Sequence, residues 1–370
     1  MSEQLQLECP HFEHMLVLPH IAIHNFNAIN SSHTCGISIT AFIGAMHALE
    51  RKARAAGWDW QFCCVGIVVH DHSLQAISSQ FTSALLLTRN PIKGYLREDK
   101  KIASSEPNSE TGAKEKFAPI IEEGRIHLTV TLTFGIYSES MSGAGDADKA
   151  SQVRQWLAGM RLGGGSVWQS PIVHPKRQQP WWLSLGDSPA DRAQAFASAK
   201  LKLLPGFTLV DRSDLLPIRL QQMQKTQPQA STLDAWLSLC RTNWEWNEVQ
   251  GKWLSDRPKG SGWIVPIPAG YAALTHLLAA GSVANARDTT TPFRFVESVY
   301  SVGEWLGPHR LTHPQDMMWW PQYQHATGLY RCCNGYQPPA PALESESAET
   351  SALAKAHENT PPTAPDPAEA

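Results

Sequence analysis

Arginine and aromatic residues are interleaved within residues 285–310, a pattern typical of sites that recognise single-stranded nucleic acid. The segment holds three arginines and four aromatic residues: Arg287, Phe293, Arg294, Phe295, Tyr300, Trp305 and Arg310. A guanidinium group is planar, binds phosphate through two parallel hydrogen bonds and stacks on flat rings. Single-stranded nucleic acid offers both phosphates and unstacked bases, so it fits this chemistry.

A structural interpretation of the same segment is also open. The residue pattern favours a helix over 291–306, with the aromatic rings in the core and the charges in solvent. Asp288, Glu297 and Glu304 would balance the three arginines. On the chemistry of the segment alone, the structural interpretation is favoured over a binding site.

A glycine-rich turn follows a fourth arginine. Arg161 precedes Gly163, Gly164, Gly165 and Ser166. Glycine lets the backbone approach a bulky, flat group, and it also lets two elements of a fold pack closely. In the first case the arginine would meet a phosphate. The alternative is a flexible turn after a helix.

Two more arginines border a long charged insertion at residues 92–119. Arg89 and Asn90 lie just before the insertion, and Arg125 follows it. Because the two ends of a hairpin meet in space, Arg89 and Arg125 are expected to be neighbours. Two like charges repel unless an anion lies between them, which makes this pair a candidate phosphate site. Ion pairs with the two glutamates before Arg125 are the alternative.

Four histidines offer other chemistry. The spacing of His309 and His313 suits a metal, but zinc would require a cysteine near the C-terminus to fold back, so no metal site is predicted. His33 and His47 are candidates for the acid or base of a metal-independent ribonuclease. A turn role for His33 and helix packing for His47 are the favoured alternatives. No motif predicts a cofactor.

The composition argues for a local rather than a general positive surface. The 370 residues carry a net charge of −3, and 42% of them are apolar. Residues 337–370 contain six acids and one lysine, so the rest of the chain is near +2. With this charge balance the protein is not expected to bind duplex DNA through charge alone, but a local RNA-binding patch is possible. The seven cysteines show no Cys-x-x-Cys spacing, which predicts reduced thiols. The sequence also predicts neither a signal peptide nor a membrane segment. Together these features predict a cytoplasmic protein.

The order of the expected elements indicates an α+β fold. Strands and helices are predicted in the order β-α-β-β-α-β, at residues 14–25, 38–56, 61–70, 125–137, 146–160 and up to 167. This is the ferredoxin-like arrangement found in RNA-recognition folds. Residues 1–168 would form this domain with 92–119 inserted as a hairpin. Residues 169–336 would form a mixed, partly helical second lobe with an edge or irregular strand over 262–268, and 337–370 a disordered acidic tail.

Nine ordered motifs carry a resemblance to one known family. They are LTRNP at Leu87, IEEGRIHL at Ile121, MRLGGGS at Met160, LLPGF at Leu203, TLDAWLSLCR at Thr232, GWIVPIPAGY at Gly262, NARD and TPFRFVE from Asn285, GEWLGPHR at Gly303 and GLYR at Gly328. From about His14 to Arg331 the sequence resembles the Csy-two family. These proteins are the Cas-five-like RAMP subunits of the type I-F CRISPR RNA-guided surveillance complex.

The resemblance implies a non-catalytic subunit with a ferredoxin-like RAMP domain, an inserted thumb and a second helical part. Such a subunit pairs with the large subunit and caps the 5′ handle of the CRISPR RNA. Its thumb reaches the neighbouring backbone subunit, and the assembly recognises foreign double-stranded DNA in antiviral defence. The insertion at 92–119 is longer and more charged than expected of the family, and the tail after Tyr336 looks like an addition.

The resemblance also turns the candidate residues into an expected RNA-binding set. These residues are Arg89, Asn90, Arg125, Arg161, Gly164, Gly165, Ser166, Arg287, Phe293, Arg294, His309 and Arg310. Two other functions stay open. One is an endoribonuclease that processes CRISPR repeat RNA, and the other is a protein scaffold anchored by paired tryptophans: Trp181, Trp182, Trp319 and Trp320.

Overall fold

The computed structural model describes residues 8–31, 34–80, 82–89, 120–122, 124–141, 146–170, 172–257, 262–286 and 288–338, with only the backbone at 87–89 and 120–122. The insertion at 92–119 and three candidate residues, His33, Asn90 and Arg287, lie outside the described residues. The chain divides into two units, Met1–Tyr336 and Gln337–Ala370. The architecture below belongs to the first unit, and nearly all of the predicted acidic tail lies outside the described residues.

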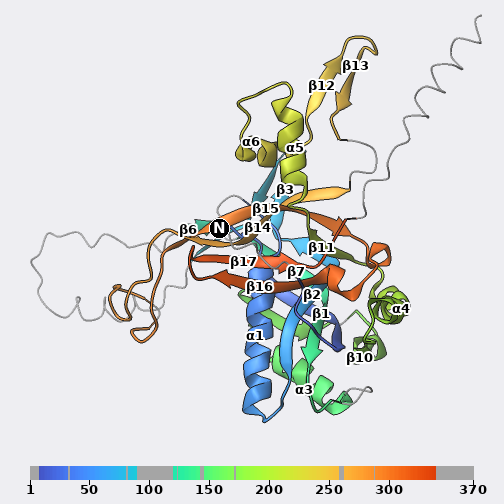
Figure 1. Cartoon of the computed structure of the whole chain (residues 1–370). Helices are drawn as coiled ribbons and strands as arrows, with labels where there is room; N and C mark the ends of the chain where they lie inside the picture. Colours follow the sequence, from blue (N-terminus) through green and yellow to red (C-terminus); the bar gives the residue numbers. More distant parts are fainter. Residues whose placement is uncertain are drawn as a thin grey trace, which may run out of the picture. The chain divides into compact units, whose positions relative to one another are not determined.

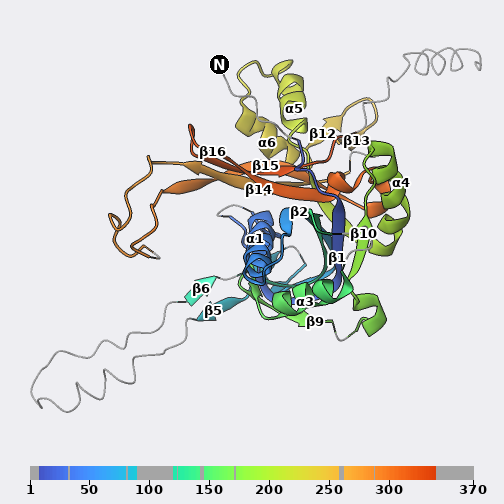
Figure 2. The same cartoon turned by 60° about the horizontal axis from the view of Figure 1, so that its bottom comes forward.

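Four strands form an antiparallel sheet with two helices on one face. The strands are β1 (His14–Asn27), β2 (Gln61–Leu74), β7 (Arg125–Tyr137) and β9 (Gly165–Gln169). Their order is β2-β7-β1-β9, and each neighbouring pair is antiparallel. The helices α1 (Ile39–Ala55) and α3 (Ala147–Ala158) pack against this sheet and each other (Figures 1 and 2).

The residue pattern explains why this layer forms. The apolar residues of α1 recur three and four positions apart, and the buried ones are Ile39, Phe42, Ile43, Ala45, Met46, Leu49 and Ala53. This spacing places them on one face of a helix. In β7 every second residue from Ile126 to Ile136 enters the same core. The helix predicted over 38–56 and the strand predicted over 125–137 are therefore confirmed.

Strand β1 contains two irregularities, and the first of them includes Pro19. Its register with β7 shifts between Leu18 and Ile21 and again between Ile23 and Phe26. His20 and Asn25 have positive φ angles of 50° and 59° at these points. Such bulges bend a strand and change the direction of its side chains. The strand predicted over residues 14–25 therefore exists but twists twice before it reaches its end.

A second group of strands extends the sheet. It consists of β11 (Phe207–Asp211), β14 (Trp263–Ala273), β15 (Val296–Leu306), β16 (Met318–Gln324) and β17 (Leu329–Asn334). Their order is β11-β15-β14-β17-β16, and the strands at both ends of this series pair with β2. The pairings therefore close a ring through β2. The predicted domain boundary at residue 168 lies within β9. Strand β2 of the first predicted lobe pairs with β11 and β16 of the second.

The helix predicted over 291–306 is wrong, because residues from Val296 onward form strand β15. This strand has β14 on one side and β11 on the other. Valines at 296, 299 and 302 favour an extended strand, and pairing on both sides outweighs a helical pattern that was weak. Strand β14 pairs with β15 along its length but with β17 only at Gly270 and Tyr271, so its two prolines need no partner on that side.

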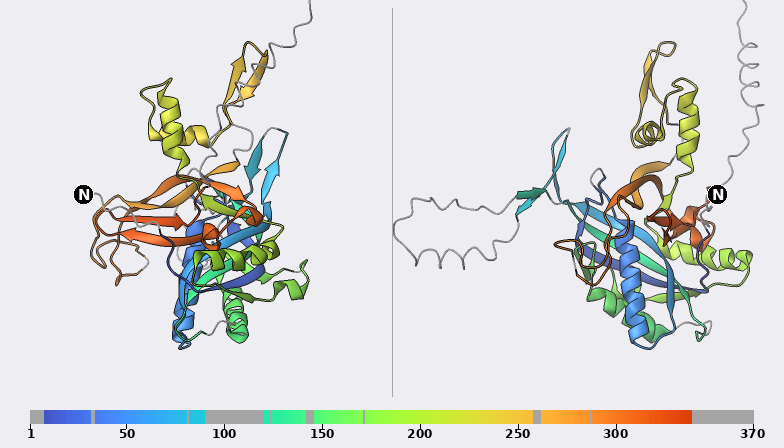
Figure 3. Two further views of the ribbon diagram at one scale, coloured as in Figure 1. Left: turned by 45° about the vertical axis from the view of Figure 1, so that its right-hand side comes forward. Right: turned by 60° about the vertical axis from the view of Figure 1, so that its left-hand side comes forward.

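The remaining elements are short. The strands are β3 (Ala76–Ser78), β4 (Ser83–Leu85), β5 (Leu87–Arg89), β6 (Ile120–Glu122), β8 (Arg161–Leu162), β10 (Trp181–Ser184), β12 (Trp244–Asn247) and β13 (Lys252–Ser255). The helices are α4 (Pro189–Ala199), α5 (Leu215–Gln224) and α6 (Thr232–Leu239), with 3-10 turns at Pro175–Gln178, Lys200–Leu203, Pro308–Arg310 and Pro314–Met317. The second group of strands lies between α1 and the group of α5 and α6 (Figures 1 and 3).

The protein is thus a mixed α and β structure whose strands pair mostly antiparallel. Within the described ranges, no helix is long and apolar enough to cross a membrane.

Candidate nucleic-acid interface

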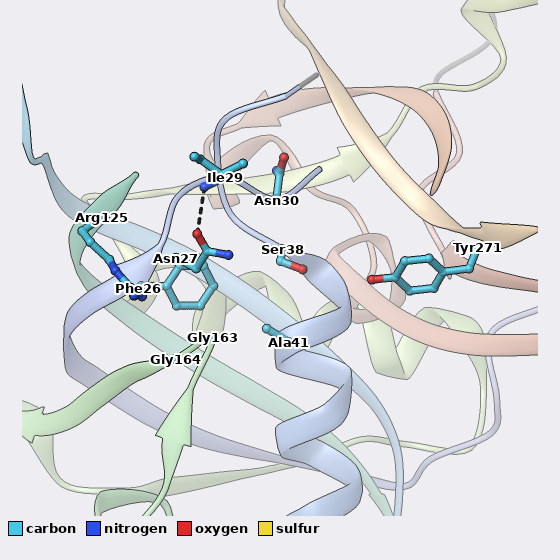
Figure 4. A pocket seen from close by; sticks show the side chains of 10 residues that line it. All are labelled: Phe26, Asn27, Ile29, Asn30, Ser38, Ala41, Arg125, Gly163, Gly164 and Tyr271. Atoms are coloured by element: carbon cyan, nitrogen blue, oxygen red, sulfur yellow. Dashed lines mark hydrogen bonds between the residues drawn. The ribbon is translucent and has the colours of Figure 1, made fainter. Parts of the chain in front are cut away.

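A cleft of about 530 Å³ opens where the end of β1, the start of α1 and the glycine-rich turn meet (Figure 4). It is lined by Phe26, Asn27, Ile29, Asn30, Ser38, Ala41, Arg125, Gly163, Gly164 and Tyr271. Two of the predicted RNA-binding residues, Arg125 and Gly164, therefore come together here. The cleft combines a guanidinium group, amide side chains and exposed backbone, which are the donors that bind phosphate.

The start of α1 contributes to the positive character of the cleft. Ser38 caps the helix with an extended backbone, and its side chain makes no capping hydrogen bond within the part of the chain that the structure describes. The first turn carries no acidic residue. The first N–H groups of a helix lack partners within the helix and carry a partial positive charge, so they favour an anion.

Arg125 begins β7 and reaches over the glycine-rich turn. Its Nη1 donates to the carbonyl oxygen of Asn25 at 3.4 Å. A Cβ atom added at Gly164 would lie 3.4 Å from the same Nη1. Figure 4 shows the guanidinium group directed toward Phe26 and Gly164. Arg125 is half-buried, so its position is partly fixed by packing.

The glycines of the turn have different roles. Gly163 and Gly164 have φ angles of 53° and 80°, which favour glycine. A Cβ atom at Gly163 would lie 2.3 Å from the Phe26 ring, and one at Gly165 would lie 2.7 Å from the carbonyl oxygen of His24. These two glycines therefore permit close packing within the protein. Gly163 and Gly164 both line the cleft, and Gly164 is the exposed one of the two, so its backbone is open to a ligand.

The neighbours of the turn lie beside the cleft. Ser166 is half-buried in β9 and pairs with His24 of β1 and with Arg161 of β8. Arg161 is exposed. Neither residue lines the cleft, although both are within three residues of Gly164.

Sequence reasoning missed several residues of the cleft. Asn27 and Asn30 shape the loop after β1. The Asn27 Oδ1 accepts from the N–H of Ile29 at 3.2 Å (Figure 4). The Asn30 Nδ2 donates to the Ile37 carbonyl at 3.0 Å. Asparagines between a strand and a helix cap are a signal for such a loop. Tyr271 gave no signal in the sequence, because it lies in β14 and the folding of the second group of strands brings it to the cleft.

The expected neighbourhood of Arg89 and Arg125 is only partly described. Strands β5 and β6 pair so that Arg89 lies opposite Ile120 and Leu87 opposite Glu122 (Figure 2). Arg125 lies three residues further on, where its carbonyl accepts from the N–H of Gln75 at 2.8 Å. The side chain of Arg89 lies outside the described part of the chain.

Phe293 and Arg294 lie at the loop end of the β14–β15 hairpin. The Arg294 Nη1 donates to the Tyr323 hydroxyl at 3.0 Å, and the Phe293 ring meets Phe295 edge-on at 5.0 Å. Tyr323 pairs with Tyr330, and Tyr330 pairs with Tyr271 of the cleft. Directly paired residues share a face of the sheet, so a row of three tyrosines connects Arg294 to the cleft.

His309 and Arg310 lie at the opposite end of β15. Ten residue steps separate the ends of this strand, which corresponds to about 30 Å. The Arg310 Nη1 lies 4.0 Å from the Glu304 Oε1, while Arg212 binds the other oxygen of the same carboxylate. Glu304 has only 3% of its side chain exposed. Arg294 and Arg310 therefore do not lie in one cluster, and Arg287 lies outside the described residues.

The other candidate chemistry finds little support among the described residues. His47 is half-buried on α1, and burial lowers the pKa of its imidazole. His313 caps a 3-10 turn together with Asp316. In the ranges that the structure describes, no three metal-ligating side chains form a cluster. Trp319 and Trp320, expected as interface anchors, are instead buried in the core at 1% and 3% exposure.

The fold and the cleft define a mixed α/β protein with a local cleft that contains a guanidinium group and a helix start, and comparison with known proteins gives its family. Residues 16–332 match the family described as CRISPR-associated protein (Cas_Csy2). CRISPR-associated protein Csy2 of Pseudomonas aeruginosa (strain UCBPP-PA14) is 38% identical over 331 residues, which cover 86% of this chain and 94% of that protein. The chain belongs to the Csy2 family of CRISPR-associated proteins.

Proposed function

We propose that this chain is a non-catalytic subunit of the type I-F CRISPR surveillance complex and that it binds and caps the 5′ handle of the CRISPR RNA together with the large subunit. The observation that carries the proposal is the cleft, in which Arg125, Gly164 and the start of α1 converge. Membership of the Csy2 family supports the setting in a CRISPR complex.

The cleft suits one or two phosphates of a single strand. The Arg125 guanidinium supplies a bidentate cationic donor, and the first N–H groups of α1 favour negative charge. Gly164 lets the RNA backbone come close because it has no side chain. A chain body near +2 needs a local site of this kind, since a general positive surface is absent from its composition.

The strand order supports a ferredoxin-like RAMP domain. The order β2-β7-β1-β9 with α1 and α3 on one face is the order expected from a β-α-β-β-α-β chain. The insertion at residues 92–119 leaves this domain between β5 and β6, where a thumb would reach the neighbouring backbone subunit. In the assembled complex the chain would take part in recognition of foreign DNA in the cytoplasm, as a component of antiviral defence.

The test measures binding of the 5′-handle RNA by the chain co-purified with its large subunit. Arg125→Ala should weaken binding and lower the salt slope by about 0.7, the value for one contact to a single-stranded phosphate. Arg125→Lys should recover the charge but not the bidentate grip. Arg54→Ala is the control, because Arg54 lies on the exposed end of α1 and pairs only with Glu50 among the ion pairs of the described residues.

The outcomes separate the proposal from its alternatives. Unchanged affinity and an unchanged salt slope for Arg125→Ala would remove the cleft from the RNA-binding surface. Metal-independent cleavage of repeat RNA by the purified chain, abolished by His33→Ala, would favour the ribonuclease instead.

A further inference from the structure

An exposed tryptophan lies beside the cleft on the face of the sheet opposite the helices. Trp168 in β9 has 59% of its surface exposed, whereas its neighbour Val167 is buried in the core under the helices. Successive side chains of a strand point to opposite faces. Trp168 is therefore held on the open face by the burial of Val167, and its large apolar ring remains in solvent.

Two histidine rings extend this surface across neighbouring strands. The His24 ring of β1 lies 6.3 Å from Trp168 at an interplanar angle of 33°, and the His127 ring of β7 lies 5.0 Å from His24. His24 is exposed and His127 is half-buried. The planes of His24 and His127 are 64° apart, so His127 meets His24 edge-on, whereas His24 and Trp168 are closer to parallel. These three rings from three adjacent strands are here named the ring platform.

A hydrogen bond orients the inner ring of the platform. The Asn25 N–H donates to the Nδ1 of His127 at 3.3 Å, and the Gln75 side-chain amide donates to the Oδ1 of Asn25 at 2.6 Å. These contacts fix His127 before a ligand binds, so this end of the platform is preorganised.

The platform and the cleft share strands β1 and β7. Arg125 and His127 are two residues apart in β7, so they share a face, and both bind the backbone of Asn25. Ser166, next to the glycine turn, pairs with His24. A single strand with a phosphate at Arg125 would therefore bring an adjacent base over the rings.

The surroundings of the platform suit a base, which has flat apolar faces and a polar edge. A shallow hollow of about 230 Å³ beside the rings is lined by the apolar residues Ala22, Leu128 and Ile172. The same hollow contains Asp71, Ser73 and Ser170, which offer hydrogen bonds to the edge of a base. This mixed lining matches both the face and the edge of an unstacked base.

We propose that Trp168 and His24 stack on one unstacked base of single-stranded RNA whose adjacent phosphate lies in the cleft. This inference rests on the proposed function, because it requires handle RNA in the cleft. It adds a base contact from residues that the phosphate chemistry alone does not need. Stacking on an aromatic ring tolerates any base, so the platform would fix the path of the strand rather than read its sequence.

The experiment compares wild-type and Trp168→Ala complexes, purified with the large subunit, on handle RNAs that carry one abasic position at a time. Trp168→Ala should weaken binding of intact RNA by about 5- to 150-fold without changing the salt slope. One abasic position should weaken the wild type and have no further effect on Trp168→Ala. Trp168→Phe should restore most of the affinity. Trp244→Ala is the matched control, because Trp244 is also 59% exposed.

Each outcome decides a different point. If the wild-type complex fails to bind handle RNA, the proposed function falls and the platform with it. If the wild type binds and Trp168→Ala binds equally well, only the platform is refuted. If Trp168→Ala instead loses the large subunit during purification, Trp168 contacts protein and the base contact is wrong. Loss of affinity in Trp244→Ala to the same extent would show a general effect of exposed tryptophans and also overturn the proposal.

Discussion

The glycine turn offers a sharp test, because two adjacent glycines with similar backbones face different surroundings. Gly163 and Gly164 both have positive φ, so alanine at either position should cost about 1–2 kcal/mol in backbone strain. At Gly163 the added methyl group would also overlap three atoms of the Phe26 ring, at 2.3–2.6 Å. Overpacking of a core adds about 1–3 kcal/mol. Gly163→Ala should therefore lose about 2–5 kcal/mol of unfolding free energy, and Gly164→Ala about 1–2 kcal/mol.

The assay is denaturant unfolding followed by tryptophan fluorescence, combined with handle-RNA binding. Gly164→Ala should stay folded yet bind RNA more weakly, since its methyl group would enter the cleft 3.4 Å from Arg125. Gly163→Ala should show the larger shift in the unfolding midpoint. Equal destabilisation of the two variants would refute the packing argument. A stable Gly164→Ala variant with full RNA affinity would show that the turn does not approach the ligand.

Two further predictions concern charged groups. Glu304→Ala should destabilise the fold by about 1.5–3 kcal/mol, because it removes a buried charged hydrogen bond to Arg212 and leaves Asp214 as its carboxylate partner. Arg310→Ala should cost less than about 1 kcal/mol because Arg310 is exposed. Urea unfolding of both variants checks the difference, and similar losses would contradict it. Burial, with nearby cationic groups, lowers the pKa of His20 from 6.5 to about 4. Between these values the unfolded chain binds a proton that the folded chain does not, so unfolding free energy should fall by about 1–3 kcal/mol as pH drops from 6.5 to 4 and stay level above 6.5. His20→Asn, which tolerates the positive φ, should flatten that part of the stability–pH profile, and an unchanged profile would assign the loss to other groups.

Local patterns in the sequence predicted the elements that have strong periodicity. The seven buried residues of α1 and the alternation in β7 are visible without a structure, because each depends only on the spacing of apolar residues along one element. The same patterns identified Arg125 and the glycine turn as candidates, since both arguments concern what a residue type can do. Local patterns did not predict strand β15, because this strand is stabilised by pairing with β11 and β14 rather than by its own residue spacing.

The sequence by itself determined the family, the main helices and strands, and the residue types able to bind phosphate. Only the tertiary structure decided which of those residues meet. It joined Arg125 to Gly164 and to the start of α1, and it separated Arg294 from Arg310 by the length of a strand. It also placed Trp168 next to His24, a contact that depends on β1 and β9 being neighbours in the sheet. The physical reason is that side-chain chemistry is a local property, whereas a binding site is set by the pairing of distant strands, which residue spacing alone does not encode.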